Sequence, residues 1–414
     1  MTPFKKTRLI SIIFVCLFLV SCAQTQETGI DPGPEQLAQK LKTKKYVLEP
    51  FNKAVQTLSV HLMAQINAQV NRDISPEKES GKIVIVIDPF INADSGEVLQ
   101  VSRKIEKAII KESEKHENLE AARLTSDNLK DAKYIVNGTV GYAQLKTGET
   151  KGLQKYYHIA STVRNLAEIS VIGKSDVWVT DQDLDYSPAA VYLDNPFFFQ
   201  GKRPEGMPQE KLSEQEYFDR LATRAMLIEA GTAYENRDYE KAVALFQNAE
   251  QREDGKLIET YAGLYMTHYK LGNMEEAEKA FGRIVALSVS RYNVLSVRFL
   301  FSVNSDYFLS DNLLRGKYDT WIRQIGKFFN KSDYCIQIMG HCSRTGAETY
   351  NKKLSLMRAV HIQKLMQPHF QDVMKRSKTI GMGFKHTIVG TGSDDDRDAL
   401  DRRVEIKVVD CREF

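Results

Sequence analysis

Apolar positions in the first half of the chain follow two periods. Unbroken runs of β-branched residues predict strands covered on both faces, and apolar positions recurring every three or four residues predict amphipathic helices. Helices are expected over 45–70 and 101–110, and strands over 82–90, 119–125, 133–140, 156–163 and 167–180. Helices that alternate with strands in this way predict a compact α/β sandwich over 45–182.

The next segment, 183–216, holds four prolines and an aromatic group and is expected to be a linker. The aromatic group consists of Tyr192, Phe197, Phe198 and Phe199. Such a group predicts packing against a neighbouring domain, and an exposed partner site is the alternative.

An internal repeat follows the linker. The segment that starts at Tyr239 aligns with the segment that starts at Met274, and Ala242 and Ala277 are 35 residues apart. A small residue at the helix contact and a phenylalanine four positions later resemble the second helix of a tetratricopeptide repeat. This resemblance implies two helix pairs over 217–290. Two repeats are too few to support themselves, so the array is expected to lean on a flanking domain. Its concave face is expected either to bind a peptide or partner helix, or to act as a spacer only.

The last region, 291–414, again mixes both periods. Strands are expected over 298–301, 335–339, 386–389 and 404–409, and helices over 311–329 and 350–366. In the second helix, Leu354, Met357 and Ile362 are expected to face inward and Lys352, Lys353 and Gln363 outward. The whole chain is therefore expected to be multidomain, with an α/β sandwich, a short helical array and a C-terminal α/β domain.

Residues 1–21 have a basic start and an apolar run over 9–20. The run is shorter than the roughly 20 residues that span a bilayer, and it is typical of a secretory signal. The segment ends in Leu19-Val20-Ser21-Cys22, which resembles the bacterial lipoprotein box. The resemblance implies that Cys22 is lipidated and that Ala23 directs the protein to the outer membrane, facing the periplasm. A plain signal or an uncleaved anchor are the alternatives. Residues 22–44 are expected to be a tether.

Without the signal segment the chain carries 54 basic and 54 acidic residues. This balance gives no indication of nucleic-acid binding. Cys335, Cys342 and Cys411 would remain in an oxidising periplasm. Cys335 opens one expected strand and Cys411 follows another, so antiparallel pairing of the two strands would allow a Cys335–Cys411 disulfide. His341 and Cys342 are too few ligands for a metal site, and no cofactor or metal is expected.

The candidate chemistry lies at the start of the helix over 350–366. Asn351, Ser355 and Arg358 share one helix face, and a guanidinium is a planar fork suited to a carboxylate. We therefore expect a site for a small anionic ligand. The alternative is that Arg358 caps the helix or pairs with a surface acid.

The same stretch resembles the OmpA-like peptidoglycan-binding domain. The shared motifs are Gly340-His341-Cys342-Ser343-Arg344-Thr345-Gly346, the helix from Tyr350 to Ala359, and the closing Arg402-Arg403-Val404-Glu405. The resemblance implies that Arg358, with Asn351 and Arg402, binds the diaminopimelate of the peptidoglycan stem peptide. The family's aspartate is replaced by Ser343, which cannot neutralise the ligand's ammonium. Either the affinity for the ligand is lower than in the family, or another carboxylate takes over. Asp394–Asp396 or Asp398 could supply that carboxylate.

The first domain more weakly resembles lipoprotein domains of the curli-secretion, FlgO-type and penicillin-binding-protein-activator families, through Val86–Phe90 and Tyr134–Thr139. These families share a fold and not one activity. Asp88 is a candidate site residue, although a strand-end turn residue is the more ordinary interpretation.

No nucleophile elbow, zinc-protease motif or phosphate-binding loop is present in the sequence, so an enzyme is not expected. The leading hypothesis is an outer-membrane lipoprotein that binds peptidoglycan non-covalently and scaffolds a protein partner on its helical or N-terminal domain. The alternative is a periplasmic regulator or accessory of a peptidoglycan synthase, secretion or motility machine.

Overall fold

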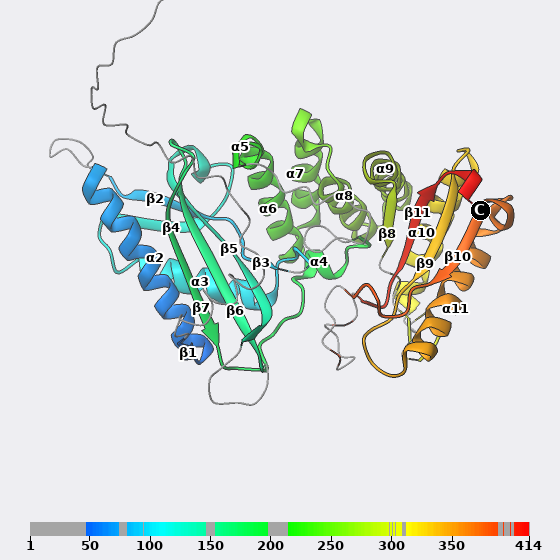
Figure 1. Ribbon diagram of the computed structural model, residues 1–414. Coiled ribbons are helices and arrows are strands. Elements are labelled where there is room, and N and C mark those ends of the chain that lie inside the picture. Colours follow the sequence, from blue (N-terminus) through cyan, green and yellow to red (C-terminus); the bar gives the residue numbers. More distant parts are fainter. Residues whose placement is uncertain are drawn as a thin grey trace, which may run out of the picture. The chain divides into compact units, whose positions relative to one another are not determined.

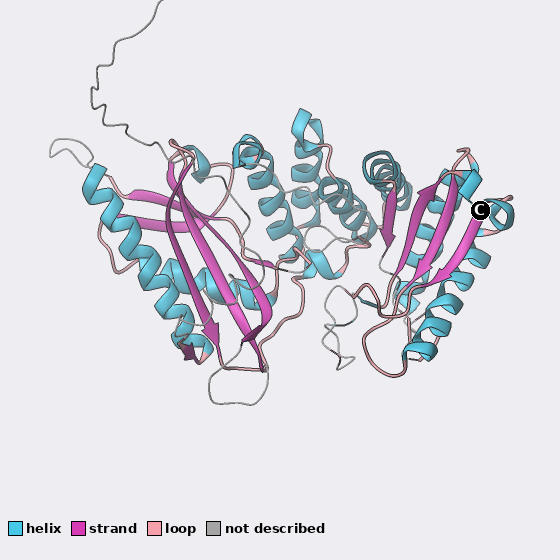
Figure 2. Ribbon diagram, in the orientation of Figure 1, coloured by secondary structure: helices cyan, strands magenta, loops and turns pink. Residues whose placement is uncertain are grey.

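The computed structural model describes most of the chain beyond residue 46 (Figures 1 and 2). The described residues are 47–73, 81–93, 95–145, 154–197, 214–297, 299, 301–302, 304–308, 312–387, 392, 398 and 401–413. Cys22, the tether and the acidic run Asp394–Asp396 lie outside them.

Seven strands of the N-terminal domain form one sheet in the spatial order β1-β7-β6-β5-β2-β4, with β3 paired to β5. The strands are β1 (Leu48–Glu49), β2 (Ile83–Ile87), β3 (Ile91–Asn92), β4 (Leu119–Arg123), β5 (Ala132–Leu145), β6 (Gln154–Asn165) and β7 (Ser170–Val179). β2 runs parallel to β4 and β5, whereas β5, β6 and β7 are successively antiparallel. The helices α2 (Phe51–Asp73) and α3 (Gln100–Ser113) pack on one face of the sheet (Figure 1). η1 (Asn128–Lys130) lies between β4 and β5.

β2 shows why an unbroken apolar run was needed. Ile85 and Ile87 belong to the core shared with α2 and α3, whereas Val86 belongs to a second core with Leu221 and Ala225 of α6 (Leu221–Glu235). Successive side chains of a strand point to opposite faces, so both faces of β2 require apolar residues.

Four helices follow in the middle of the chain, and we call them the helical array. They are α6, α7 (Tyr239–Gln251), α8 (Ile258–Lys270) and α9 (Met274–Tyr292), each packed on the next along the chain, with η2 (Glu253–Gly255) after α7. The repeated positions are equivalent in the structure, because Ala242 and Ala277 are both buried, as are Phe246 and Phe281. Gly263 lets α8 approach α7, since a Cβ there would lie 2.2 Å from the ring of Phe246.

The C-terminal domain contains a four-stranded sheet in the order β10-β9-β11-β8. Its strands are β8 (Val294–Val297), β9 (Cys335–Gly340), β10 (Ser377–Gly381) and β11 (Val404–Val409), and its helices are α10 (Asn312–Asn330), α11 (Glu348–Met366), α12 (Val373–Arg376) and η4 (Cys411–Glu413). β10 runs parallel to β9, whereas β11 is antiparallel to both β9 and β8.

Three expectations for this domain were wrong. The first strand is β8, four residues before the expected 298–301. The described His386 and Thr387 lie in no strand, and the strand of that region is β10, which was not expected. On α11, Gln363 is buried and donates to Ser377 Oγ at 2.8 Å, whereas Met357 is exposed. Gln363 reaches inward because its amide finds a buried hydroxyl partner.

The described part of the linker packs against the domains around it, as its aromatic residues predicted. It includes α4 (Ala190–Leu193) and, after the undescribed residues, α5 (Glu214–Asp219). The Asp194 carboxylate receives hydrogen bonds or ion pairs from Tyr234 Oη, Lys270 Nζ and Lys317 Nζ at 2.7, 2.9 and 3.0 Å. These partners come from α6, α8 and α10. Phe197 pairs with Val297 of β8 through a single antiparallel bridge.

Within the described residues, no helix is both long enough and apolar enough to cross a membrane.

Candidate functional site

The expected site residues on α11 do share one face, and that face points into the domain. Asn351, Ser355 and Arg358 are all buried, with 4%, 0% and 1% of their surfaces exposed. The seven-residue spacing between Asn351 and Arg358 is two helical turns, which stacks them on one side of the helix.

Arg358 joins two loops. Its Nε donates to Ser305 O at 3.0 Å and its Nη2 to Ser302 O at 3.3 Å, in the segment after β8. Its Nη1 donates to His341 O at 3.3 Å and approaches Cys342 Sγ at 3.5 Å, in the loop after β9. The guanidinium also lies 5.0 Å from the ring centre of Phe301. Arg358 is therefore neither a helix cap nor a surface residue, and it fixes the walls of the region in which the ligand was expected.

Asn351 and Ser355 hold the neighbouring turns. Asn351 Nδ2 donates to Thr345 O at 2.5 Å and to Ala347 O at 3.2 Å, which fixes the loop that precedes α11. Ser355 Oγ accepts from Gly383 N at 2.9 Å and donates to Lys352 O at 3.0 Å. Both side chains thus act on backbone groups of the loops around Arg358.

Glycines allow α11 to lie close against the sheet. A Cβ at Gly340 would fall 1.9 Å from Ser355 O, and one at Gly381 would fall 2.3 Å from Lys352 O. Because any side chain at these positions would displace α11, the site depends on both glycines.

Ser343 lies in the loop between β9 and α11 and is 5% exposed, with its Oγ 3.4 Å from Thr345 Oγ1. Arg402 is also buried, with 9% of its surface exposed. Asp398 is fully buried, and Asp394–Asp396 fall outside the described residues. The structure therefore brings Ser343, Asn351, Ser355 and Arg358 together around one loop.

Beneath this loop lies a charged cluster that the sequence did not lead us to expect. Arg403 Nε lies 2.6 Å from Glu405 Oε1, and His341 Nε2 lies 3.5 Å from Glu405 Oε2. Burial, and then the nearby Arg403, lower the pKa of His341. Burial alone would raise the pKa of Glu405, but Arg403 and His341 lower it overall. The available signal was the spacing of Arg403 and Glu405, since residues two apart in a strand face the same side.

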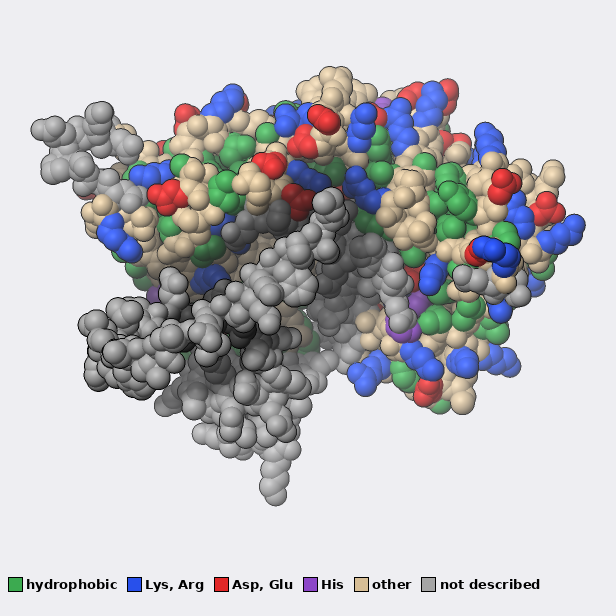
Figure 3. Space-filling view, turned by 45° about the horizontal axis from the view of Figure 1, so that its top comes forward, with side chains coloured by type: hydrophobic (Ala, Val, Ile, Leu, Met, Phe, Trp, Pro, Cys, Tyr) green, Lys and Arg blue, Asp and Glu red, His purple; other side chains and the backbone are tan. Residues whose placement is uncertain are grey.

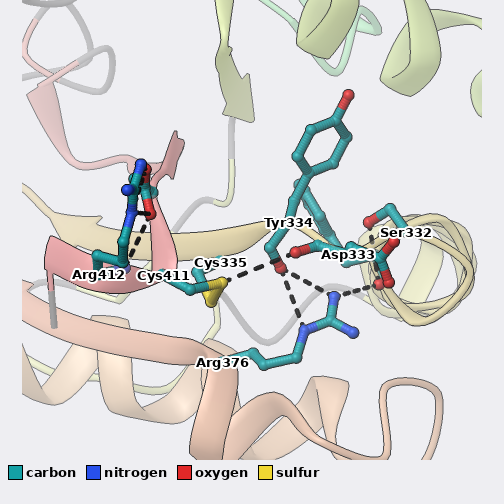
Figure 4. Close-up of a disulfide and its surroundings, with 9 residues drawn as sticks. Ser332, Asp333, Tyr334, Cys335, Arg376, Cys411 and Arg412 are labelled. Carbon is teal, nitrogen blue, oxygen red and sulfur yellow. Dashed lines mark hydrogen bonds and ion pairs between the residues drawn. A yellow bond between two sulfur atoms is a disulfide. The ribbon is translucent and has the colours of Figure 1, made fainter.

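The structure contains the disulfide Cys335–Cys411, with the two sulfurs 2.01 Å apart and the Cα atoms 5.1 Å apart (Figure 4). It links the start of β9 to η4, just beyond the antiparallel pair Cys335 and Val409. Arg376 reaches the same end of the domain and donates to Tyr334 O and Phe329 O. Cys342 is buried and takes no part in a disulfide.

Asp88 is buried at the edge of the N-terminal domain and serves a contact between domains. Its Oδ2 accepts from Arg224 Nε at 2.7 Å and from Tyr217 Oη at 2.9 Å. Burial and the adjacent Asp88 raise the pKa of Tyr217. Asp88 directly follows β2, as the strand-end interpretation expected, and it also forms an interdomain ion pair.

Comparison with known proteins identifies one part of the chain. Residues 310–400 match the model of the OmpA family. No significant match was found among curated proteins. The C-terminal domain is therefore an OmpA-like domain.

Three similar solved structures each cover about three tenths of the chain. The periplasmic domain of Helicobacter pylori MotB is 18% identical over 28% of this chain and 74% of its own, with a TM-score of 0.23. The cell wall anchor of the T6SS from Pseudomonas aeruginosa is 21% identical over 31% of this chain and 95% of its own, with a TM-score of 0.24. The OmpA-like domain of FopA1 from Francisella tularensis is 20% identical over 28% and 75%, with a TM-score of 0.23.

Proposed function

We propose that the protein is an outer-membrane lipoprotein that binds peptidoglycan non-covalently through its C-terminal domain and thereby tethers the cell envelope. The observation that carries the proposal is the OmpA-family match over 310–400, within which the buried Arg358 organises the loops at 302–305 and 341–342. Lipidation of Cys22 supplies the second attachment. Because both attachments are on one chain, a weak affinity for the wall suffices.

The ligand is the diaminopimelate of the stem peptide. Arg358 receives its carboxylate in exchange for the carbonyls of Ser302 and Ser305, to which its Nη2 and Nε donate in the structure. A guanidinium forms paired charge-assisted hydrogen bonds with a carboxylate, which are stronger than bonds to neutral carbonyls.

Ser343 Oγ accepts a hydrogen bond from the ligand's ammonium. Asn351, Ser355 and Arg402 hold the surrounding loops in place. A serine gives a weaker contact than the family's aspartate, since a hydrogen bond to a charged group contributes about 1.5–3 kcal/mol when both charges are present and about 1 kcal/mol for a neutral pair.

The test is co-sedimentation of residues 23–414 with purified diaminopimelate-containing sacculi. The whole segment is used because the helical array and the C-terminal domain share one core. Ser343→Asp is expected to raise wall affinity about tenfold, whereas Arg358→Ala removes most binding. Arg412→Ala is the matched control, because it removes one positive charge from the exposed end of the same domain.

Two results would contradict different parts of this proposal. A folded Arg358→Ala variant that sediments like the unmodified chain, verified by circular dichroism, would show that the site is wrong. An unmodified chain that stays in the supernatant would show that the function is wrong.

A protein partner is proposed for the N-terminal domain. The face of the helical array made by α6 and α8 already packs against the chain's own Val191 and Tyr192, beside a cavity of about 80 Å³. Capture experiments with residues 23–414 anchored on sacculi are expected to recover an envelope protein. Recovery of wall fragments alone favours a simple tether, and recovery of a synthase, secretion or motility component favours a regulator.

A further inference from the structure

Positive charge is concentrated in one part of a chain that is otherwise balanced. Residues 22–414 carry 54 basic and 54 acidic residues, yet 335–387 contains nine lysines and arginines and only two acids, Glu348 and Asp372. Asp372 forms an ion pair with Lys375, with Lys375 Nζ 3.6 Å from Asp372 Oδ1. The stretch therefore has a formal charge of +7, and the rest of residues 22–414 has −7.

Three of these nine cations, all lysines, lie on the solvent side of α11. We call this surface the α11 face and define it by Tyr350, Lys352, Lys353, Leu356, Met357 and Lys364, all exposed. None of its three lysines forms an ion pair with a residue in the described part of the chain. Two acids lie near this surface: Glu348, in the first turn of α11, and Asp306, which interacts electrostatically with His361. Figure 3 shows several Lys and Arg side chains at the lower right of the view, where the C-terminal domain lies, and others along the top of the view.

The α11 face also exposes apolar side chains. Tyr350, Leu356 and Met357 are 48%, 39% and 41% exposed. At 100° per residue, Lys353 and Lys364 fall between them around the helix, so they do not form one apolar stripe. A helix that inserts into a lipid surface needs such a stripe. Interleaved ammonium groups and apolar patches instead fit a hydrated polymer that carries regularly spaced carboxylates.

The α11 face is continuous with the proposed ligand site. α11 begins directly after the loop of Ser343, and exposed Arg344 extends the positive surface onto that loop. On the other side, exposed Lys385 follows Gly383, whose backbone N–H is bonded to Ser355. A polymer held by one stem peptide at this loop would therefore have cations next to it, at Arg344 and at the start of the α11 face.

We propose that the α11 face is a second wall contact, which binds the carboxylates of neighbouring stem peptides on the same peptidoglycan. This inference rests on the proposed function and adds a polymer-specific contact to it. Exposed ammonium–carboxylate pairs are individually weak and are screened by salt. Their combined effect is therefore expected to be salt-sensitive and to appear only with a ligand that carries many carboxylates.

The experiment compares two ligands, intact sacculi and one soluble diaminopimelate-containing stem peptide, with residues 23–414. The test variant is Lys352→Glu/Lys353→Glu/Lys364→Glu. The matched control is Lys104→Glu/Lys107→Glu/Lys111→Glu, which makes the same charge change on the exposed side of α3. Circular dichroism and thermal unfolding verify that both variants fold.

The α11 variant is expected to bind sacculi about tenfold more weakly at low salt, consistent with three weak surface pairs. The difference is expected to shrink at high salt, and affinity for the single stem peptide is expected to stay within about twofold of the unmodified chain. The α3 control is expected to match the unmodified chain with both ligands.

Three results would overturn the inference while leaving the proposed function intact. The first is equal sacculus binding by the α11 variant and the α3 control. The second is an equal loss of stem-peptide binding by the α11 variant, which would make these lysines part of the primary site. The third is binding of the unmodified chain to phosphatidylglycerol vesicles that the α11 variant loses, with sacculus binding retained. Failure of the unmodified chain to bind either wall ligand would instead contradict the proposed function.

Discussion

The joint between α9 and α10 is built from aromatic rings, whereas the joint between the N-terminal domain and α6 is built largely from charges. In the first, which we call the aromatic joint, the ring of Phe281 stacks on that of Trp321 with centroids 5.9 Å apart, and Trp321 Nε1 donates to Tyr265 Oη at 2.6 Å. The same core continues from the array into β9, β11 and α11. The helical array and the C-terminal domain therefore share one hydrophobic core.

The second, which we call the ionic joint, has a different chemistry. Arg224 pairs with Asp88 at 2.7 Å and Arg103 with Glu235 at 2.8 Å, while Arg123 donates to Thr232 Oγ1 at 3.1 Å. A small apolar core, with Val86, Leu221 and Ala225, supports these contacts. Burial disfavours the charged form of Arg224, whereas the Asp88 carboxylate favours it. The effect of Asp88 is the larger overall, so the pKa of Arg224 is raised.

The different chemistry of the two joints predicts which domains unfold together. Apolar burial does not depend on charge screening or on the charge state of neighbours, whereas partly exposed ion pairs depend on both. We therefore expect the array and the OmpA-like domain to unfold as one unit and the N-terminal domain to respond separately. The two tryptophans report on the two sides, because Trp178 lies in β7 and Trp321 in the aromatic joint.

The largest effect is expected from Phe281→Ala. Loss of a fully buried phenylalanine removes its apolar contacts and leaves a cavity, which costs about 3–5 kcal/mol of the free energy of unfolding. Urea unfolding followed by Trp321 fluorescence measures this change. Tyr307→Ala, at a side chain that is 69% exposed, is the control and is expected to change stability by less than about 0.5 kcal/mol. A loss below about 1 kcal/mol for Phe281→Ala would contradict the shared core.

Removal of the disulfide is expected to be the next largest effect. The cysteines are 76 residues apart, and loss of a disulfide that closes such a loop costs about 2–4 kcal/mol. Cys335→Ser/Cys411→Ser is expected to lower the midpoint seen by Trp321 and to leave the midpoint seen by Trp178 unchanged. Equal shifts of both signals would show that the ionic joint transmits stability as strongly as the aromatic one.

Asp88→Ala is expected to have an intermediate effect that is confined to the ionic joint. It leaves the Arg224 guanidinium without its carboxylate, but the Arg224 side chain is 31% exposed, so the loss is nearer about 2 kcal/mol than the 3–5 kcal/mol of a fully buried pair. Trp178 fluorescence during urea unfolding measures it. The double variant Asp88→Ala/Arg224→Met is expected to recover part of the loss, and no recovery would show that the pair is not coupled.

The smallest effect is expected from a change in pH. It tests the charged cluster of His341, Arg403 and Glu405. The pKa of His341 is lower in the folded chain than its ordinary 6.5, so the unfolded chain binds more protons below that pH. Stability followed by Trp321 is therefore expected to fall as the pH decreases from neutral through 6.5. It is expected to fall further below 4.5, where the contribution of ionised Glu405, with its lowered pKa, is lost.

His341→Gln tests the cause of this pH dependence. The variant is expected to reduce the slope between pH 7 and pH 5 only in part, because the pKa values of His268 and His361 are also lowered, mainly by burial. An unchanged slope would mean that His341 does not contribute.

The sequence predicted the elements whose apolar positions follow a clear period. It missed or misplaced elements that are held by contacts with other segments. The closing strand was expected at 404–409 and is β11 at Val404–Val409, since its apolar residues alternate with Glu405 and Lys407 as in a strand. β10 was missed because Ser377-Lys378-Thr379-Ile380-Gly381 is polar, and it is held as an edge strand by pairing with β9. β8 was placed four residues late because the apolar side chains of 299–301 outweighed those of Val294–Val297.

The candidate site shows the same division. The helix face of Asn351, Ser355 and Arg358 followed from their spacing alone. The sequence could not predict which groups Arg358 binds, because every residue has a backbone carbonyl. These groups are Ser302 O, Ser305 O and His341 O. The Asp88–Arg224 pair was likewise not foreseen, because its members are 136 residues apart.

The most direct test of the account is a calorimetric titration of residues 23–414 with two soluble stem peptides that differ only in their third residue, diaminopimelate or lysine. The two residues differ by one carboxylate, which is the group proposed to meet Arg358. The diaminopimelate peptide is expected to bind at least tenfold more tightly, and Arg358→Lys is expected to remove most of this preference. Equal affinity for the two peptides, or no binding of the diaminopimelate peptide, would contradict it.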